Sequence, residues 1–557
     1  MKKSAPSLSL GVFLGFALLF SLQAVPNLSR NSLTNDEAFE ITNGYYYLTQ
    51  GDVTAEQEHV PLGDALEALP LLFLGLHTLP FAGDSFARSH FFVFVWNQDK
   101  LLALTFWPRL VDWLFGLALG FLIFRATRKE RPWAFAALAL WAFNPMILAM
   151  TALAKTDIPA TFFFFAAVLI YEKRRNPESR SYFAAGAVSG IAILCKLSCV
   201  AILPLFVILD LWNGWKSKTR TQARELWRSA KNWAWLAAGT WLVIGAVYLP
   251  GTCLLPGHQW PWGYFIDKFK DLVAFSHRPF PVFFWGAASL HNHWLYFPVS
   301  FLLKSPLPFI LLIGLGLFLG LQKRVPMPAA QWIPPLVFGL SILHVLNLGI
   351  RFYLPAYPFL ILIAARAAQW LWIQGIGNER KLLSWTGAGL LVWQAVSVAA
   401  SFPNHLSYFN DLVPPEKKIF FLADSNLDWG QDHLRLAAVA RERGWTKIKL
   451  AYFGAADPAA YGLAWEPWRE KDLAGPQPGW VYAVNADFLQ LGPAFYPSAL
   501  PIAQSWISQR PPTGKVADSW YYFEIPGNPA ADTSPFLPSA PFQQYRGFVP
   551  YRPGSRE

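Results

Sequence analysis

Long apolar runs recur through the first 400 residues of this chain, and they leave few ways for it to fold. A helix needs roughly 17 to 25 mostly apolar residues to cross a bilayer, and runs of this length alternate with short charged segments. The 557 residues are 54% hydrophobic and 15% charged, whereas a soluble domain carries about 25% charged residues. The sequence therefore predicts a polytopic α-helical membrane protein.

The apolar runs predict eleven membrane-spanning helices. Their approximate ranges are 8–25, 103–124, 133–151, 157–171, 182–197, 198–212, 233–250, 306–321, 333–349, 354–372 and 383–400. The segment 61–81 is also apolar, but Asp64, Glu67 and His77 interrupt it. Because a span here would invert the sidedness of every later loop, we expect it to lie flat on the membrane as one or two interfacial helices.

Clusters of Lys and Arg predict the orientation. The clusters all fall on one face, which the positive-inside rule makes cytoplasmic: Lys2-Lys3, Arg125 to Arg131, Lys173 to Arg175, Lys216 to Lys231, Lys323-Arg324 and Arg380-Lys381. The first loop, 26–102, and the loops 151–156, 251–305 and 350–353 then face outwards. The apolar N-terminus has the charged start of a signal peptide but a poor cleavage site at Leu22-Gln23-Ala24. We therefore expect an uncleaved first helix with a cytoplasmic N-terminus, in the inner (plasma) membrane.

The composition changes near residue 402, which divides the chain into a transmembrane domain (1–402) and a C-terminal domain (403–557). The second part contains four strand-like runs and an amphipathic stretch at 432–443, so we expect an extracytoplasmic α/β domain. The runs are KIFFLADS (418–425), IKLAYFG (448–454), GWVYAVN (479–485) and SWYYFEI (519–525). The sequence of this part has no Gly-rich phosphate fingerprint, so we assign it no nucleotide.

Charge and cysteine content exclude two further classes. The net charge is +11, but the basic residues sit in short clusters between apolar runs, whereas nucleic-acid binding needs a continuous basic face. The three cysteines, Cys195, Cys199 and Cys253, give neither a disulfide framework nor a zinc-binding spacing.

Two acidic pairs in the first outer loop are candidates for chemistry. Asp36 and Glu37 lie at the mouth of the first span, where an aspartate can deprotonate an acceptor hydroxyl or amine. The alternative is structural, because Thr34-x-x-Glu37 fits a capping box and Asp36 suits the first turn of a helix. Glu58 and His59 are candidate metal ligands or acid/base groups, or simply a solvated pair.

Further candidates lie at the outer ends of later spans. Lys155 and Asp157 could serve a phosphate or metal site, although Asp157 could also cap its helix. Lys196 could bind an anion or extend to the interface, and the guanidinium of Arg351 suits a phosphate. His293 could bind metal or anchor an aromatic interfacial segment. Since the predicted topology places all of these residues on the outer side, we expect a single site.

The order of these motifs resembles a known family. The motifs are DE in the first outer loop, EHVPLG, ALAKTDIPATFF, GIAILCK and RFYLPAYPF. Together they resemble the polyprenyl-phosphate-sugar-dependent glycosyltransferases of the GT-C fold, which include protein O-mannosyltransferases and the lipid A aminoarabinose transferase. The resemblance covers about residues 10–400. The tail, with YFNDLVPPEKKIFFLADSNLDWGQDHL, is similar to a bacterial family-39-like branch.

The resemblance implies an inverting transfer of a sugar from a polyprenyl-phosphate carrier to a protein, lipid or glycan acceptor outside the cytoplasm. It makes Asp36 the base or a metal-site acid, puts Glu58, Asp157 and His293 in a divalent-metal site, and points Lys196 at the carrier phosphate. The family's protein O-mannosyltransferases have His-Pro-Pro-Leu where this chain has His59-Val60-Pro61-Leu62, so the acceptor class stays open.

Two other functions stay open on the sequence. A transporter or flippase of a lipid-linked or anionic substrate is the first, although such proteins tend to carry internal repeats and midplane sites, and neither is visible in this sequence. The second is an inactive member whose outer domain binds a partner; the retained acids and bases argue against it.

Overall fold

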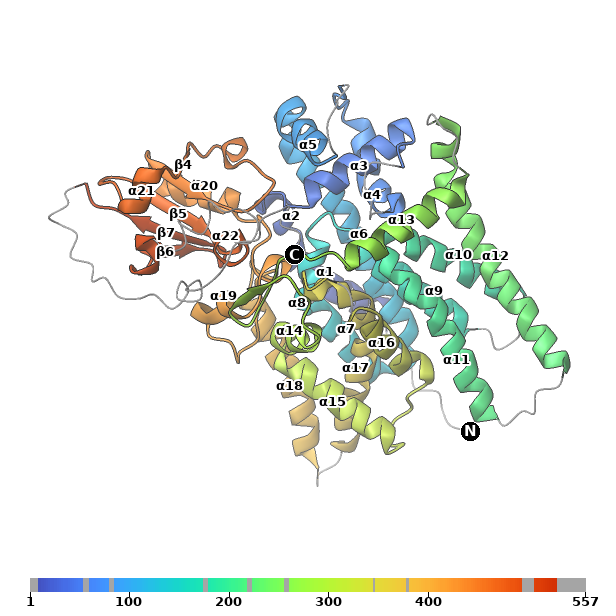
Figure 1. The fold of residues 1–557 in the computed structure, drawn as a ribbon. Coiled ribbons are helices and arrows are strands. Elements are labelled where there is room, and N and C mark those ends of the chain that lie inside the picture. Colours follow the sequence, from blue (N-terminus) through green and yellow to red (C-terminus); the bar gives the residue numbers. More distant parts are fainter. Residues whose placement is uncertain are drawn as a thin grey trace.

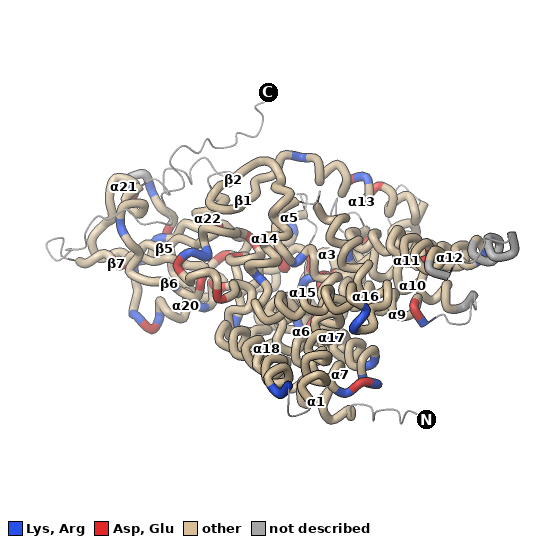
Figure 2. Tube along the Cα trace, turned by 90° about the horizontal axis from the view of Figure 1, so that it is seen from below, with Lys and Arg blue, Asp and Glu red and all other residues tan. Residues whose placement is uncertain are grey.

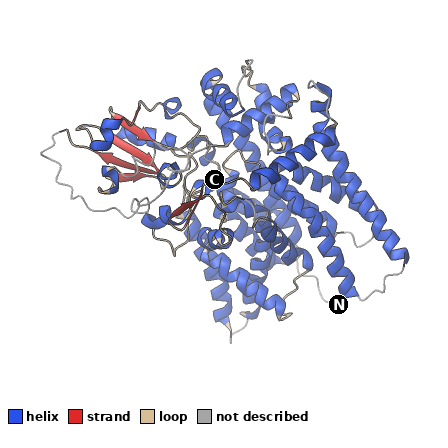
Figure 3. Ribbon diagram, in the orientation of Figure 1, coloured by secondary structure: helices blue, strands red, loops and turns tan. Residues whose placement is uncertain are grey.

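The computed structural model describes residues 9–53, 60–79, 85–173, 179–217, 223–254, 260–343, 346–376, 380–492 and 505–527. Within these ranges the chain forms a large helical bundle with a small β-sheet beside it (Figures 1 and 3). Charged residues lie mainly at helix ends and in the sheet-containing part, while most helical turns of the bundle carry none (Figure 2).

Each of the eleven predicted spans contains a helix. The helices are α1 (Leu10–Ala24), α6 (Leu101–Thr127), α7 (Arg131–Ala142), α8 (Pro145–Thr151), α9 (Asp157–Glu172), α10 (Ser179–Cys195), α11 (Ile202–Ser217), α12 (Ala223–Leu254), α15 (Leu307–Leu321), α16 (Ala329–Ser341), α17 (Tyr357–Gln374) and α18 (Lys381–Ala399). Six helical segments of the described chain are long and apolar enough to cross a membrane, or up to eight if each of two bent pairs is one span. The count of eleven therefore stays a prediction.

One bent pair shows how a local sequence shapes the bundle. The bend between α7 and α8 is 55° and falls at Asn144-Pro145, where the proline disfavours helical backbone in the residue before it. Asn144 accordingly has extended backbone, and its side chain accepts a hydrogen bond from the Ile147 amide at 3.1 Å. The bend redirects α8 and the loop after it, which carries Lys155 and leads into α9.

The described part of the predicted first outer loop folds into short helices at one end of the bundle, several of them at the top of Figure 1. They are α2 (Asn27–Arg30), α3 (Glu37–Gln50), α4 (Pro61–Ala68), η1 (Leu69–Phe73), α5 (Ser85–His90), η2 (Phe91–Trp96) and η3 (Gln98–Lys100). The described part of 61–81 is thus an eight-residue helix and one 3-10 segment, too short to span a bilayer. This agrees with the expectation that the segment does not cross the membrane.

The loop before α15 contains α13 (Pro261–Ser276), a hairpin of β1 (Val282–Phe284) and β2 (Ala287–Ser289), and α14 (Tyr296–Lys304). A 3-10 segment, η5 (Ile350–Ala356), leads into α17. In the helical segment Ile350–Gln374, which contains η5 and α17, 83% of the most apolar stretch is buried. This part of the chain therefore forms the centre of the bundle.

The C-terminal part contains a five-stranded mixed sheet in the order β4-β3-β5-β7-β6. The strands β3 (Ile448–Ala451), β4 (Glu466–Pro467) and β5 (Val481–Asn485) are parallel, while β6 (Gly514–Val516) and β7 (Trp520–Glu524) pair antiparallel. The predicted helix is α20 (His433–Glu442); α21 (Glu470–Ala474), α22 (Ala486–Gln490), η8 (Pro458–Tyr461) and η9 (Trp506–Ser508) complete this part. Tyr482 and Phe523 of the sheet belong to the same buried apolar cluster as the bundle helices.

The prediction of a strand at KIFFLADS (418–425) is wrong. This segment forms α19 (Lys418–Phe421) and the start of η7 (Asp424–Asn426), and η6 (Pro415–Lys417) directly precedes it. Ile419 and Leu422, three residues apart, are both buried, which is the spacing of one helix face rather than of a strand. Leu422 makes a single bridge to Phe284 of the outer hairpin, so tertiary contacts override the β propensity of the run.

Gly44 allows a close approach that the outer helices need. A Cβ at this position of α3 would lie 2.0 Å from the backbone oxygen of Asp64 in α4.

We expect Gly44→Ala to push the helices apart and lower the free energy of unfolding by about 1–3 kcal/mol, as overpacking does. Thermal unfolding of the purified protein in detergent measures this. Gly389→Ala in α18 is the matched control, since nothing lies within 4 Å of its added Cβ; equal effects of the two changes would contradict the prediction.

Candidate functional site

Five of the predicted residues meet in one cluster of charges. Lys155 Nζ lies 3.2 Å from Asp36 Oδ2, and Arg351 Nη2 lies 3.5 Å from the same oxygen. Arg351 Nη1 lies 3.4 Å from Asp157 Oδ2, while the other oxygen of Asp157 pairs with Lys196. The sequence positions of these residues span more than half of the chain, so only the fold brings them together.

Helix ends and breaks aim these side chains at one another. Asp36 is the N-cap residue of α3 but makes no side-chain capping bond, and Asp157 is the first residue of α9. Lys196 lies in extended backbone where α10 ends and η4 (Leu197–Ala201) begins. Arg351 lies in the first turn of η5. Asp36 therefore lies at the helix N-terminus, as its structural alternative expected, and its carboxylate faces the cations Lys155 and Arg351.

Exposure separates the roles of the charged groups. The Asp36 side chain is 38% exposed, against 1% for Lys155 and 1% for Asp157. Lys196 and Arg351 lie between, at 13% and 9%. Asp36 is thus the acid that a substrate can reach, and Lys196 and Arg351 are the more accessible cations.

A sixth charged residue, Glu40, joins the cluster and was missed by the sequence analysis. Its carboxylate pairs with Lys155. Burial raises the pKa of Glu40 to about 7, although Lys155 opposes this shift. Burial also disfavours the charge on Lys155, but Asp36 and Glu40 outweigh it and raise the pKa of that amine. Glu40 lies four residues after Asp36, on the same helical face, and that spacing was the available signal.

Glu37, predicted to be catalytic, lies in the interior and pairs with Arg109. Its side chain is fully buried and accepts four hydrogen bonds of 2.7 Å: two from Arg109 and one each from the amides of Thr34 and Ala154. The bond from Thr34 is one half of the capping box. Arg109 was missed, although an arginine inside an apolar span signals a special role.

Of the other predicted residues, the structure describes His293, while Glu58 and His59 fall outside the described residues. The His293 amide donates to Asn347 Oδ1 at 2.5 Å, its ring lies 5.4 Å from that of Phe284, and no described contact joins it to Asp157. Within the described chain, no group of three or more His, Cys, Asp and Glu side chains could hold a metal ion. Since both Asp157 oxygens face cations, the described residues do not fit the expected metal site.

Two residues of the C-terminal part also contact the cluster and were not singled out in the sequence. Ser425 Oγ accepts a hydrogen bond from Arg351 Nε at 3.1 Å. The Trp429 ring lies 4.3 Å from the Arg351 guanidinium carbon and 5.0 Å from Lys155 Nζ. The site is therefore built from both parts of the chain.

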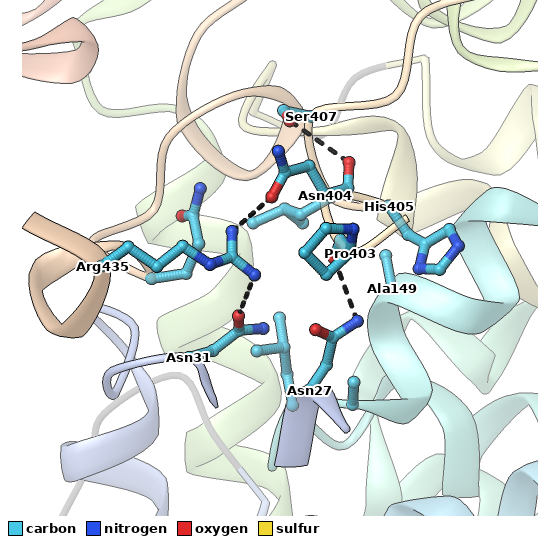
Figure 4. A pocket seen from close by; sticks show the side chains of 12 residues that line it. Asn27, Asn31, Ala149, Pro403, Asn404, His405, Ser407 and Arg435 are labelled. Carbon is cyan, nitrogen blue, oxygen red and sulfur yellow. Dashed lines mark hydrogen bonds between the residues drawn. The ribbon is translucent and has the colours of Figure 1, made fainter. Parts of the chain in front are cut away.

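A small polar pocket marks the seam between these two parts (Figure 4). Arg435 donates to Asn31 Oδ1 at 2.8 Å, and Asn27 donates to the Pro403 carbonyl at 3.0 Å across it. None of the predicted site residues lines this pocket, so we place the chemistry at the charged cluster beside it.

The fold and cluster define an integral membrane protein with acids and cations gathered at one end of its bundle. A family model described as dolichyl-phosphate-mannose-protein mannosyltransferase matches residues 92–248, which carry Lys155, Asp157 and Lys196. The match covers well under half of the chain and confirms the resemblance to polyprenyl-phosphate-sugar glycosyltransferases of the GT-C type. No curated protein matches the chain.

Two solved structures align over most of the chain with low similarity. ArnT from Cupriavidus metallidurans bound to undecaprenyl phosphate aligns with a TM-score of 0.44 and 13% identity, over 92% of this chain and 98% of ArnT. The archaeal oligosaccharyltransferase AglB from Archaeoglobus fulgidus, in complex with an inhibitory peptide and a dolichol-phosphate, gives 0.46 and 12%, over 88% of this chain and 70% of AglB. Similarity at this level carries no conclusion about the site.

Arg109→Met tests the buried pair. The change leaves the Glu37 charge unpaired in the interior, and we expect it to lower the free energy of unfolding by about 3–5 kcal/mol. Thermal unfolding in detergent measures the loss. Lys270→Met is the control, because its pair with Asp267 is exposed (70% and 50%) and such pairs stabilise little. A stability equal to that of the control would show that the pair is not needed.

Glu40→Gln tests the raised pKa. Because that pKa rises from 4.5 to about 7, the folded state holds a proton in this range that the unfolded state releases. The resulting stabilisation is complete below pH 4.5 and is lost as the pH rises through 7. We expect Glu40→Gln to flatten the fall of the melting temperature between these pH values, and the exposed Glu442→Gln to leave it unchanged. An unaltered slope in Glu40→Gln would contradict the assignment.

Proposed function

We propose that the charged cluster transfers a sugar from a polyprenyl-phosphate carrier to an acceptor on the outer side of the membrane. The observation that carries the proposal is that the accessible acid Asp36 meets Arg351, and that Arg351 and Lys196 both pair with Asp157 in the same cluster. The family match over residues 92–248 supports the same class of donor.

In the proposed reaction, Asp36 removes the proton from the acceptor nucleophile as it attacks the anomeric carbon. The bond between this carbon and the carrier phosphate breaks, and the attack from the opposite side inverts the configuration. Arg351 and Lys196 stabilise the negative charge on the departing phosphate, as cations aimed at a developing charge do.

Lys155 takes a different role from the one expected. It was predicted to bind the donor phosphate, but its side chain is buried between Asp36 and Glu40. We assign it to orienting the Asp36 carboxylate. The two accessible cations are then left for the phosphate, and the apolar helix surfaces are left for the carrier chain.

Asp36→Asn tests this function. The amide keeps the shape of the carboxylate but cannot accept the proton, so we expect turnover to fall by roughly 10²–10⁴-fold. The assay follows hydrolysis or transfer of sugar from polyprenyl-phosphate-sugar donors by the purified protein, with undecaprenyl phosphate as the product measured. Asp267→Asn, at an exposed acid of α13, serves as the control and should retain full turnover.

Two results would reject the proposal. Full turnover in Asp36→Asn would remove Asp36 from the reaction. Movement of an intact lipid-linked sugar across proteoliposomes, without release of carrier phosphate, would instead support the transporter alternative. Comparing envelope glycans of cells with and without the chain would identify the sugar and the acceptor.

A further inference from the structure

A segment of the C-terminal part, residues 424–433, lies directly on the charged cluster, and we call it the roof segment. We propose that it belongs to the donor-phosphate site, with Trp429 and Ser425 as positioning residues that hold Arg351 and Lys155. This inference deepens the proposed function and rests on it. Its support comes from contacts with three separate parts of the bundle.

The first set of contacts is with the cations themselves. Trp429 is 2% exposed, and its ring faces Arg351 at 4.3 Å and Lys155 at 5.0 Å. Ser425 Oγ accepts from Arg351 Nε at 3.1 Å and donates to the Leu348 carbonyl at 2.7 Å. An aromatic face attracts a cation without neutralising it, so the guanidinium is fixed while its charge stays available to an anion.

The second set ties the roof segment to the loop that carries Asp36. The Asn35 amide donates to the Trp429 carbonyl at 2.9 Å, and the Ser32 amide donates to the Gln431 carbonyl at 2.9 Å. Ser32 Oγ also donates to the Gly430 carbonyl and accepts from the His433 amide. The roof therefore fixes the acid and the cations relative to one another.

The third set reaches the segment that carries Arg351. Asn426 Oδ1 accepts from the Ile350 amide at 3.1 Å, and Asn426 Nδ2 donates to the Tyr296 hydroxyl at 2.8 Å. Gly349, with φ 153°, leaves the space that Ser425 fills, because a Cβ there would lie 2.0 Å from Ser425 Oγ. The backbone at Gly349 and the side chain of Ser425 therefore fit closely against each other.

Carboxylates inside the C-terminal part hold the roof segment in shape. Asp428 accepts from the amides of Gly430 and Asp487, each at 3.1 Å, and Asp487 Oδ1 accepts from the Asp424 amide at 3.0 Å. Burial raises the pKa of Asp428 to about 7. The segment is therefore a preformed loop whose conformation is set by the fold of the C-terminal part.

The experiment compares binding of undecaprenyl phosphate and of uncharged undecaprenol to the full-length protein in detergent. We expect Trp429→Leu to weaken binding of the phosphate roughly tenfold, the size of the lost buried cation–π contact with Arg351, and to leave binding of undecaprenol unchanged. Trp429→Phe keeps an aromatic face and should bind the phosphate nearly as tightly as the parent protein. Trp445→Leu is the matched control, because Trp445 contacts Tyr522 and Glu524 in the sheet.

The outcomes distinguish a specific role of the roof segment in phosphate binding from a general loss of structure. Equal weakening for both lipids, or unchanged phosphate binding in Trp429→Leu, would overturn the inference. Should Trp429→Leu fail to fold, Ser425→Ala decides: roughly tenfold or more weaker phosphate binding, as for a lost hydrogen bond to a charged group, supports the proposed role of the roof segment, and parent-level binding overturns it. Full turnover in Asp36→Asn would instead reject the proposed function and leave the phosphate-binding result standing.

Discussion

The buried pair of Arg109 and Glu37 is the interaction on which the site depends. Arg109 uses all five of its N–H groups: two go to Glu37, and three go to the carbonyls of Leu28, Asn31 and Ser32 at 2.8–3.1 Å. Glu37 in turn binds the Ala154 amide. One ion pair thus holds the backbone beside Asp36 against the backbone beside Lys155. Its desolvation cost is offset because every donor and acceptor is used.

The cluster around Asp36 balances charge within a small volume. Lys155, Lys196 and Arg351 face the acids Asp36, Glu40 and Asp157, and burial raises the pKa of Glu40 to about 7. Asp424 of the roof segment adds a further acid near Arg351. Such a network binds an anion only if its cations keep some freedom from their partners. Lys196 and Arg351 are more exposed than Lys155, and this difference is the basis of the roles proposed for the three cations.

The C-terminal part forms one side of the site, because its residues contact the charged cluster directly. Its sheet shares an apolar core with the bundle, and its roof segment contacts the acid loop, the cations and η5. A site enclosed by two parts of a chain excludes water better than an open rim, which strengthens every electrostatic contact inside it. The same contacts restrict how far the two parts can move independently.

The sequence by itself determined the membrane class, the helical ranges and five members of the cluster, because hydropathy, basic clusters and isolated ionisable groups are local signals. Helix α20 and the strands β3, β5 and β7 of the C-terminal part were also predicted correctly from the sequence. The sequence could not determine that 418–421 is helical, that Glu37 pairs with Arg109, or that the Trp429 ring lies against Arg351. Those depend on which segments meet in three dimensions, and contacts between residues 70 to 400 positions apart leave no periodic trace in the chain.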